Sequence, residues 1–512
     1  AADRNLDDFY EPGAVVARGA YGSVAKRKHI QSQTYRAVKR ICWPPVWTNK
    51  KAKADHQMLV EMELAVMINL HHPFVLGVRE WFVDPLGGVF LAMDWCDKGS
   101  LYDWVQLHVC SLTTKEERSN KLELLRQFSK HACEALSYMH HMCVLHRDLK
   151  PDNILLTGTE QRLTAKLVDF GLTVLQGSQL RPEDFEKGTL EYMAPEVYAG
   201  DYLNFTEGCD VWAMGIIFVN LMTAVLHGKM LHPFLENRYR RGGASIIQWH
   251  LRRTYMNQEE WDASIMDGAD DHVVELVNEI LQYSERPPAS ALCASSWMTG
   301  MDVKVNPMTR SALANFQSFW ELSEDEQRLL ALVAKNINED DERVQSLINC
   351  FRSLDVDHSG TLSRDQLLQG FESAGTPISG EDLDKLLANS SEESVKNGTI
   401  DFTLWLSSTL GRAALKADDH ADATFHALNL HHEAELDSAL FTGGEKEPAV
   451  VNKEAFRRRV KRLASRRCSV KRDRFPIILK EASAECEESR AVDIFTYPQE
   501  RVQRKISGLR SF

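Results

Sequence analysis

The sequence predicts an α+β protein of more than one domain, with a mixed N-terminal part and a helical C-terminal part. Its 512 residues are too many for one hydrophobic core, so two or three domains are expected. Near the N-terminus, VVARGAYGSVAKRKH places β-forming valines around glycines, which predicts a strand, a tight turn and a second strand. After residue 355, a loop with apolar flanks recurs at intervals of 38 and 36 residues, which indicates a tandem array.

The bulk composition excludes several classes of protein. Apolar residues make up 44% and charged residues 26%, and no uninterrupted apolar run approaches the roughly 18 residues that a membrane-spanning helix needs. The net charge of -13 argues against a nucleic-acid-binding protein, because such proteins normally carry a basic surplus. The ten cysteines form no CxxC pair, so neither a zinc site nor a disulfide framework is indicated. A reducing, cytoplasmic location is expected.

The first residues, AADRNLDDFY, contain no initiator methionine and no charged segment followed by an apolar one. A secretory signal is therefore not expected within them. A lipidated native N-terminus would lie outside these residues.

The glycine-containing turn near the N-terminus is the first candidate for nucleotide binding. Gly19 and Gly22 lie between Val16 and Val24, and glycine allows the backbone to come close to phosphate groups. Taken alone, an ordinary β-turn explains the pattern equally well. Lys39 ends the alternating strand pattern of YRAVKRI, where a solvated edge lysine is the ordinary interpretation.

Three longer motifs follow in a fixed order: VLHRDLKPDNILL at 144–156, KLVDFGLTV at 166–174 and YMAPEV at 192–197. With the glycine turn and Lys39 they resemble the signature set of the protein kinases. The resemblance covers about residues 9–298 and implies a two-lobed protein kinase fold, ATP and Mg²⁺ as cofactors, and protein substrates. LKPDN and GTLEYMAPE are similar to the motifs of serine/threonine kinases.

The resemblance assigns catalytic roles to residues of these motifs. Phosphoryl transfer needs positioning and charge neutralisation more than covalent chemistry from the protein. Asp148 would orient the substrate hydroxyl and accept its proton, and Lys150 would neutralise charge on the transferred group. Asn153 and Asp169 would hold Mg²⁺, which prefers oxygen ligands, and Lys39 would bind the α- and β-phosphates.

The nucleotide pocket is expected to form around Lys39. Its carboxylate partner is expected to be Glu63, on a segment of helical period, with Glu61 as the second choice. Met93 aligns with the gatekeeper position of the family, and Ala17 departs from it by replacing the first glycine of the loop. The complete set of residues predicted to bind ATP is Val16, Ala17, Gly19, Gly22, Val24, Lys39, Met93, Asp94 and Cys96.

Further pairings follow from the same resemblance. Thr189 is expected close to Asp148, where it would help to select the acceptor hydroxyl. Arg286 and Glu196 are expected to form a structural ion pair. The acidic residues of EDFEKGT at 183–189 would meet Arg147 and order the loop without phosphorylation.

The stretch DVDHSGTLSRDQ at 355–366 resembles the calcium loop of an EF-hand. Its candidate ligands occupy the expected alternating positions, and a glycine allows the sharp turn at the sixth position. The last residue is glutamine, which offers one neutral oxygen where glutamate would give two charged ones. A weak calcium site is therefore predicted, with the ligands Asp355, Asp357, Ser359, Thr361 and Gln366.

Two later units keep the EF-hand spacing but lose the ligands. In NGTIDFTLW at 397–405, Gly398 fits the sixth position, but Val395 and Leu404 stand at positions three and twelve. In FHALNLHHEAELDSAL, Ala434 replaces the glycine and Leu440 ends the loop. Neither unit is expected to bind calcium.

The order of kinase, helix and EF-hand repeats resembles the calcium-dependent protein kinases, from about residue 9 to 445. That family implies a junction helix that blocks the kinase and is withdrawn by calcium. A calcium-independent kinase whose EF-hand lobe is only structural or a docking module remains an alternative. A pseudokinase scaffold is disfavoured, because Lys39, Asp148 and Asp169 are present. The expected domains are 9–298 (catalytic), 299–343 (linker and junction helix), 344–445 (an all-α EF-hand-like region) and 446–512 (basic, of uncertain fold).

The basic segment FRRRVKRLASRRCSVKRDR at 456–474 contains ten lysines or arginines. A solvated tail explains it, as does contact with an acidic membrane surface or an acidic partner, including the acidic junction of this chain. Ser465 and Ser469 follow basic residues and are candidate autophosphorylation sites.

Overall fold

The structure, a computed structural model, is described over most of the two expected lobes and the EF-hand region. The described residues are 5–19, 22–30, 32–42, 66–67, 70–83, 88–159, 162–176, 187–200, 206–235, 243–299, 308–322, 327, 330–331, 333–334, 337, 341–387, 395, 398–410, 435–437 and 450–452.

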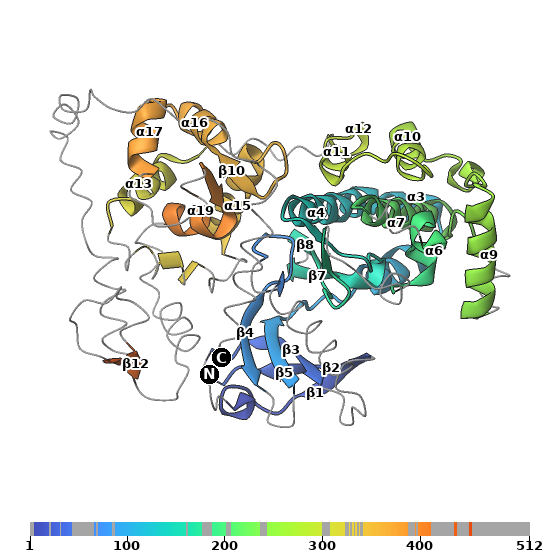
Figure 1. Ribbon diagram of the computed structural model, residues 1–512, viewed down its shortest axis with the longest axis horizontal. Coiled ribbons are helices and arrows are strands. Elements are labelled where there is room, and N and C mark those ends of the chain that lie inside the picture. Colours follow the sequence, from blue (N-terminus) through green and yellow to red (C-terminus); the bar gives the residue numbers. More distant parts are fainter. Residues whose placement is uncertain are drawn as a thin grey trace.

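The N-terminal lobe is an antiparallel five-stranded sheet in the order β1-β2-β3-β5-β4 (Figure 1). The β1–β2 hairpin closes with Gly19 opposite Gly22, as the glycine turn predicts. A side chain at Gly22 is excluded, because its Cβ would lie 1.8 Å from the Arg40 carbonyl oxygen. The strands are β1 (Ala14–Gly19), β2 (Gly22–Lys28), β3 (Tyr35–Cys42), β4 (Val78–Val83) and β5 (Gly88–Asp94), preceded by a 3-10 turn, η1 (Leu6–Asp8).

The C-terminal lobe is built around two long helices, α4 (Leu122–His141) and α7 (Gly208–His227). Two small antiparallel sheets, β6 (Val144–Leu145) with β9 (Val174–Leu175) and β7 (Ile154–Thr159) with β8 (Arg162–Leu167), carry the expected catalytic motifs. The other elements are α2 (Leu101–Val105), η2 (Gln106–Cys110), α3 (Lys115–Ser119), η3 (Pro151–Asn153), η4 (Leu190–Tyr192), α6 (Pro195–Ala199), α9 (Ala244–Met256), η5 (Ala263–Met266), α10 (Asp271–Ile280), α11 (Ala289–Cys293) and α12 (Ser296–Thr299).

Helix α7 is the one helix among the described residues whose length and composition would allow it to cross a membrane. Its apolar window is 94% buried inside the protein, which is the behaviour of a core helix. Three polar side chains, Asp210, Asn220 and Thr223, interrupt the apolar run, and all three are buried and hydrogen-bonded.

The C-terminal region forms a second hydrophobic core of helices and one small antiparallel sheet. The two strands pair Leu362 with Ile400, which joins the first loop to the second predicted unit as a paired EF-hand. The elements are α13 (Arg310–Phe319), α15 (Glu342–Leu354), β10 (Thr361–Ser363), α16 (Arg364–Ser373), α17 (Gly380–Leu387), β11 (Thr399–Asp401) and α19 (Phe402–Thr409). A short pair, β12 (Glu435–Asp437) with β13 (Val450–Asn452), follows. The predicted α+β class with an all-α regulatory region is confirmed.

Helix α13 belongs to this second core rather than to a separate junction. The Phe316 ring contacts the rings of Phe371 and Trp405, with centroids 5.8 and 6.3 Å apart. Val333 and Ile337, which lie in the expected junction at 299–343, are also buried in this core. Over its described residues, the junction therefore packs against the EF-hands. Leu329, Leu332, most of the third EF-hand-like unit and all of residues 456–474 lie outside the described residues.

Candidate active site

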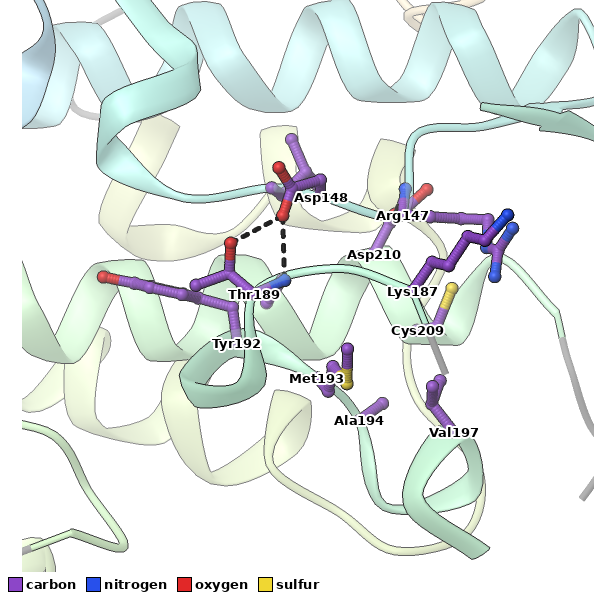
Figure 2. A pocket seen from close by; sticks show the side chains of 12 residues that line it. Arg147, Asp148, Lys187, Thr189, Tyr192, Met193, Ala194, Val197, Cys209 and Asp210 are labelled. Carbon is purple, nitrogen blue, oxygen red and sulfur yellow. Dashed lines mark hydrogen bonds between the residues drawn. The ribbon is translucent and has the colours of Figure 1, made fainter. Parts of the chain in front are cut away.

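Asp148 lies between β6 and η3, and both of its carboxylate oxygens are held by hydrogen bonds. Oδ1 accepts from the backbone nitrogen of Thr189 at 3.0 Å and from its hydroxyl at 2.7 Å, as Figure 2 shows. Oδ2 accepts from Lys150 Nζ at 2.8 Å and from Asn153 Nδ2 at 2.9 Å. These four donors fix the orientation of the carboxylate, because two of them hold each of its oxygens. Lys150 also donates to the Thr189 hydroxyl at 2.6 Å.

Asp210 of α7 holds the backbone that carries Asp148. Its carboxylate accepts from the backbone nitrogens of His146 and Arg147 at 2.8 and 2.7 Å, and His140 Nε2 lies 3.0 Å away. Burial alone would raise the pKa of Asp210, but hydrogen bonding and attraction to His140 leave it lowered. Arg147 has a φ of 70°, which is strained for a residue with a side chain, so this anchoring holds an unfavourable backbone in place.

Asp169 and Lys39 form an ion pair on the side of the site where the nucleotide is expected. Lys39 Nζ lies 2.9 Å from Asp169 Oδ1. Burial alone would raise the pKa of Asp169, but the neighbouring Lys39 ammonium lowers it below its ordinary value. Asp169 also has a positive φ, 65°, so the two strained non-glycine residues Arg147 and Asp169 flank the site. The carboxylate therefore stays ionised and able to bind a cation.

Asn153 lies beside the segment that carries Asp169: its backbone oxygen accepts from the backbone nitrogen of Val168 at 3.0 Å. Its Nδ2 donates to both the backbone oxygen and the carboxylate of Asp148, at 2.8 and 2.9 Å. Since the nitrogen is committed to these two acceptors, Oδ1 is the amide atom left to face a cation. One amide oxygen and one ionised carboxylate suit Mg²⁺, which is usually bound by one or two protein oxygens together with phosphates.

The expected adenine side of the pocket lies on β1, β2 and the end of β5. Ala17 pairs with Val24 across the hairpin, and Met93 is buried at the end of β5, close to Cys96. The Asp94 side chain turns to Arg79, whose Nε lies 3.0 Å from it, and to Arg36 at 2.9 Å. Burial would raise the pKa of Asp94, but these two guanidinium groups lower it. Only the backbone of Asp94 is then left for a nucleotide.

One further predicted ion pair has its predicted geometry. Arg286 and Glu196 form two parallel hydrogen bonds of 2.7 and 2.9 Å. Glu63, Glu61 and residues 177–186, which include most of the acidic stretch expected to meet Arg147, lie outside the described residues.

Sequence reasoning missed Asp210 and Arg79. A charged residue inside the apolar stretch CDVWAMGIIF was the available signal for Asp210.

A protein kinase domain model matches residues 10–298, more than half of the chain. The chain belongs to the protein kinase family. The kinase is 25% identical over 435 residues to calcium-dependent protein kinase 31 of Arabidopsis thaliana, an alignment that covers 84% of this chain and 83% of the relative. It is 26% identical over 466 residues to calcium-dependent protein kinase 3 of Plasmodium berghei, covering 88% and 76%.

These comparisons confirm the predicted resemblance to the calcium-dependent protein kinases. They also confirm that the enzyme is a serine/threonine protein kinase that uses ATP and Mg²⁺. The alignments extend over more than four fifths of the chain, so they include the EF-hand lobe as well as the catalytic domain.

The first EF-hand loop of the kinase is closed by its own hydrogen bonds. Gln366 Oε1 accepts from the Ser363 backbone nitrogen at 2.7 Å, and Gln366 Nε2 donates to Asp357 Oδ1 at 3.0 Å. The amide orientation is fixed, because the Ser363 nitrogen needs an acceptor. A donor, not an oxygen, therefore faces the carboxylate of Asp357. Asp355 accepts from the backbone nitrogens of Ser359 and Gly360 at 3.0 and 2.9 Å.

The charge state of the loop follows from this packing. Burial, together with a hydrogen bond to Asp357, raises the pKa of Asp355 to about 8. Among the described residues, no group of three or more His, Cys, Asp or Glu side chains is placed to hold a metal ion. Two carboxylates with Ser359, Thr361 and an amide that presents its nitrogen fit only a weak calcium site.

The same loop and its entering helix lie directly against the catalytic domain. Arg352 of α15 forms two 2.8 Å hydrogen bonds with Glu134 of α4, and its guanidinium lies 4.8 Å from the centroid of the Phe74 ring. The ion pair is buried, with the two side chains 13% and 5% exposed. A Cβ added to Gly360 would lie 2.2 Å from the Tyr138 ring, so the loop contacts α4 with no space to spare.

Proposed function

We propose that Asp148 is the group that orients the serine or threonine hydroxyl of a protein substrate and accepts its proton. The fixed carboxylate carries the proposal, because a base must be held in place before the acceptor arrives. Lys150 bridges Asp148 and Thr189, and its ammonium is placed to stabilise charge on the transferred phosphoryl group. The Thr189 hydroxyl forms one wall of the acceptor site.

On the nucleotide side, Asp169 and Asn153 are the proposed Mg²⁺ ligands, and Lys39 the proposed phosphate ligand. When bound, Mg²⁺ neutralises charge on the β- and γ-phosphates. Lys39 now pairs with Asp169 and would donate to phosphate oxygens from nearly the same position. Lys39→Met is expected to abolish ATP-dependent transfer, and ATP titration of this variant by calorimetry separates lost binding from lost chemistry. Unchanged turnover would refute the assignment.

The first EF-hand loop is the proposed calcium site of the regulatory lobe. The relatives are named for calcium dependence, and of the three units only the loop at 355–366 has both an acidic side chain at position three and the glycine at position six. Binding would require Gln366 to turn its oxygen inward and Asp355, whose pKa is raised to about 8, to be ionised. Both requirements predict a low affinity.

A second candidate role is that the lobe braces the kinase without calcium. The buried ion pair between Arg352 and Glu134 favours this role, because it joins α15 to α4 while the loop is satisfied by its own hydrogen bonds. Peptide phosphorylation by the full chain in calcium or in chelator separates the two roles. A rate that rises with calcium supports the calcium switch, and equal rates support the brace.

The cytoplasm is the proposed location, and an acidic surface is the proposed ligand of residues 456–474. The scattered cysteines support the first, since those with described side chains are all free thiols. The ten basic residues support the second. Fluorescent fusion of the full chain tests the location. Sedimentation with phosphatidylserine vesicles, compared with phosphatidylcholine vesicles, tests the ligand, and equal binding to both would contradict it.

A further inference from the structure

The segment that leaves the N-terminal sheet after β5, Asp94 to Cys96, is held by side chains of that sheet. Successive residues of an extended chain point to opposite faces of a sheet, so Asp94 and Trp95 are held from different faces. On one face, the Asp94 carboxylate is bound by Arg36 at 2.9 Å and by Arg79 at 3.0 Å. On the other face, the Trp95 ring is held by a different kind of contact.

That contact is a lysine ammonium between two aromatic rings. Lys26 Nζ lies 4.4 Å from the centroid of the Tyr35 ring and 4.6 Å from the centroid of the Trp95 ring. Both distances lie within the roughly 6 Å over which an aromatic ring attracts a cation, and tryptophan attracts it most strongly. Trp95 also packs against the main hydrophobic core of the kinase, whereas Tyr35 is 51% exposed. We name Lys26, Tyr35 and Trp95 the Lys26 clamp.

The Lys26 clamp lies on the face of the sheet that carries predicted nucleotide-binding residues. Lys26 follows Val24 by two residues on β2, so their side chains share a face. Across the sheet, Lys26 pairs with Ala37, and Ala37 pairs with Met93. Paired residues of neighbouring strands also share a face, and Figure 1 shows β2, β3 and β5 side by side. The clamp is therefore continuous with the expected adenine side of the pocket, which includes Val24 and Met93.

A neighbouring lysine on the same strand makes a different contact. Lys28 shares the face of Lys26 and pairs directly with Tyr35 across the sheet. Its ammonium nevertheless donates to the side chain of Gln33. Proximity to Tyr35 along the sheet is therefore not enough to place a lysine between the rings, and Lys28 offers a matched comparison for Lys26.

The placement of residues 94–96 matters for ATP because their backbone is what is left to contact adenine. The Asp94 side chain is committed to Arg36 and Arg79. Binding through a backbone segment is tighter when the segment is already fixed in the bound geometry, because less conformational entropy is lost. A residue that fixes the segment therefore contributes to ATP affinity through its hold on that segment.

We propose that Lys26 is a positioning residue for ATP, which holds the Trp95 ring and thereby the adenine-contacting backbone of residues 94–96. This inference rests on the proposed function, since it concerns the nucleotide site of the same kinase. It predicts that the positive charge of Lys26 lowers the KM for ATP without changing the phosphoryl transfer step.

The test measures initial rates of the full chain against ATP concentration, with Mg²⁺ and a saturating serine peptide. Lys26→Met keeps an unbranched side chain but removes the charge, and it is expected to raise the KM for ATP by about three- to tenfold at unchanged kcat. Lys26→Arg keeps a cation over the rings and should retain the wild-type KM. Lys28→Met is the matched control, because it removes a charge from the same face of the same strand, and it should also retain the wild-type KM.

A second background separates the clamp from a general effect of charge. Trp95→Leu removes one ring, and in that background Lys26→Met should change the KM for ATP by less than about twofold, because the contact is already lost. An unchanged KM in Lys26→Met alone, or the same rise with and without Trp95, would overturn the inference.

Calorimetric titration of the same proteins with Mg²⁺ and ATP measures the shift in affinity without turnover. A wild type that binds ATP but transfers no phosphate would count against the proposed function, while the affinities of Lys26→Met and Lys28→Met would still decide the role of the clamp. A wild type that binds no ATP would contradict both.

Discussion

At Gln366 a single amide takes the place of the carboxylate that an EF-hand uses to bind calcium. Its nitrogen lies 3.0 Å from Asp357 Oδ1, so the loop is held closed by a hydrogen bond instead of a cation. A glutamate in the same rotamer would place two negatively charged oxygens together. That repulsion would be relieved by calcium.

Gln366→Glu is therefore expected to tighten calcium binding by about tenfold or more, because it adds a charged, bidentate ligand to the loop. Isothermal titration calorimetry of the full chain measures the affinity. Asp365→Glu is the matched control, since Asp365 is the exposed neighbour outside the ligand positions. Equal affinities for the wild type and the Gln366 variant would exclude the loop as a calcium site.

Single residues were predicted well where the chemistry is concentrated in short motifs. Asp148, Lys150 and Asn153 lie within six consecutive residues, so their spacing alone indicates one site. Asp210 was missed because it acts from 62 residues away on the backbone of Asp148, through bonds to the two preceding residues. The turn of Asp94 toward Arg79 could not be predicted either, since it depends on which strands pair.

Between elements, the contact of α15 with α4 depends on one buried ion pair. Glu134 is 5% exposed and its pKa is lowered to about 2: burial alone would raise it, and Arg352 outweighs that effect. A charged carboxylate at this depth depends on its partner, because water cannot replace the guanidinium.

Arg352→Ala is expected to destabilise the folded chain by about 3–5 kcal/mol, because it leaves Glu134 charged and buried. Arg364→Ala is the matched control, since the Arg364–Asp384 pair is 41% and 56% exposed, and its loss should change stability far less. Thermal unfolding of the full chains compares them. Similar midpoints for both variants would show that the pair between Arg352 and Glu134 does not hold the two parts together.

The same interface predicts a dependence of stability on pH. Burial lowers the pKa of His72 to about 3, and it also lowers the pKa of His131 and His358. The charged groups that face these histidines include Glu134 and Arg352. A histidine kept neutral in the folded state takes up protons only on unfolding, so each one destabilises the fold as pH falls below about 6.5.

For His72 the free energy of unfolding falls by about 1.4 kcal/mol per pH unit between pH 6.5 and its folded pKa of about 3. The melting temperature should therefore fall between pH 7 and pH 5.5, and it should fall less in His72→Asn. In the wild type, His72 Nδ1 accepts a hydrogen bond from the Phe74 backbone nitrogen at 3.2 Å. The side-chain oxygen of asparagine keeps an acceptor for this hydrogen bond. An unchanged pH dependence in this variant would contradict the assignment.

At the scale of the whole molecule, the sequence predicted the two classes of domain but not how they meet. The strand turn, the catalytic motifs and the paired loops are local patterns, and the structure contains them at the predicted places. The packing of α13 with the EF-hands, and of the Gly360 loop on Tyr138, joins residues far apart in the chain. Such contacts leave no periodic signal in one sequence, because either partner alone is an ordinary core or surface residue.

The arrangement also connects the regulatory lobe to catalysis through structure. Helix α4 contacts α15 through Glu134 and the EF-hand loop through Tyr138, and the chain runs on from its end through β6 to Asp148. Whichever role calcium has, the central claim is that Asp148 performs the phosphoryl transfer chemistry of this chain.

The most direct test of that claim is the initial rate of phosphate transfer from ATP to a serine peptide. It is measured for the full chain and for Asp148→Asn, with Mg²⁺ and saturating calcium. The wild type is expected to turn over at about 1–100 per second, and Asp148→Asn, which keeps the shape but loses the base, at least about 100-fold more slowly. Equal rates for the two proteins, or no transfer by a folded wild type, would contradict the account.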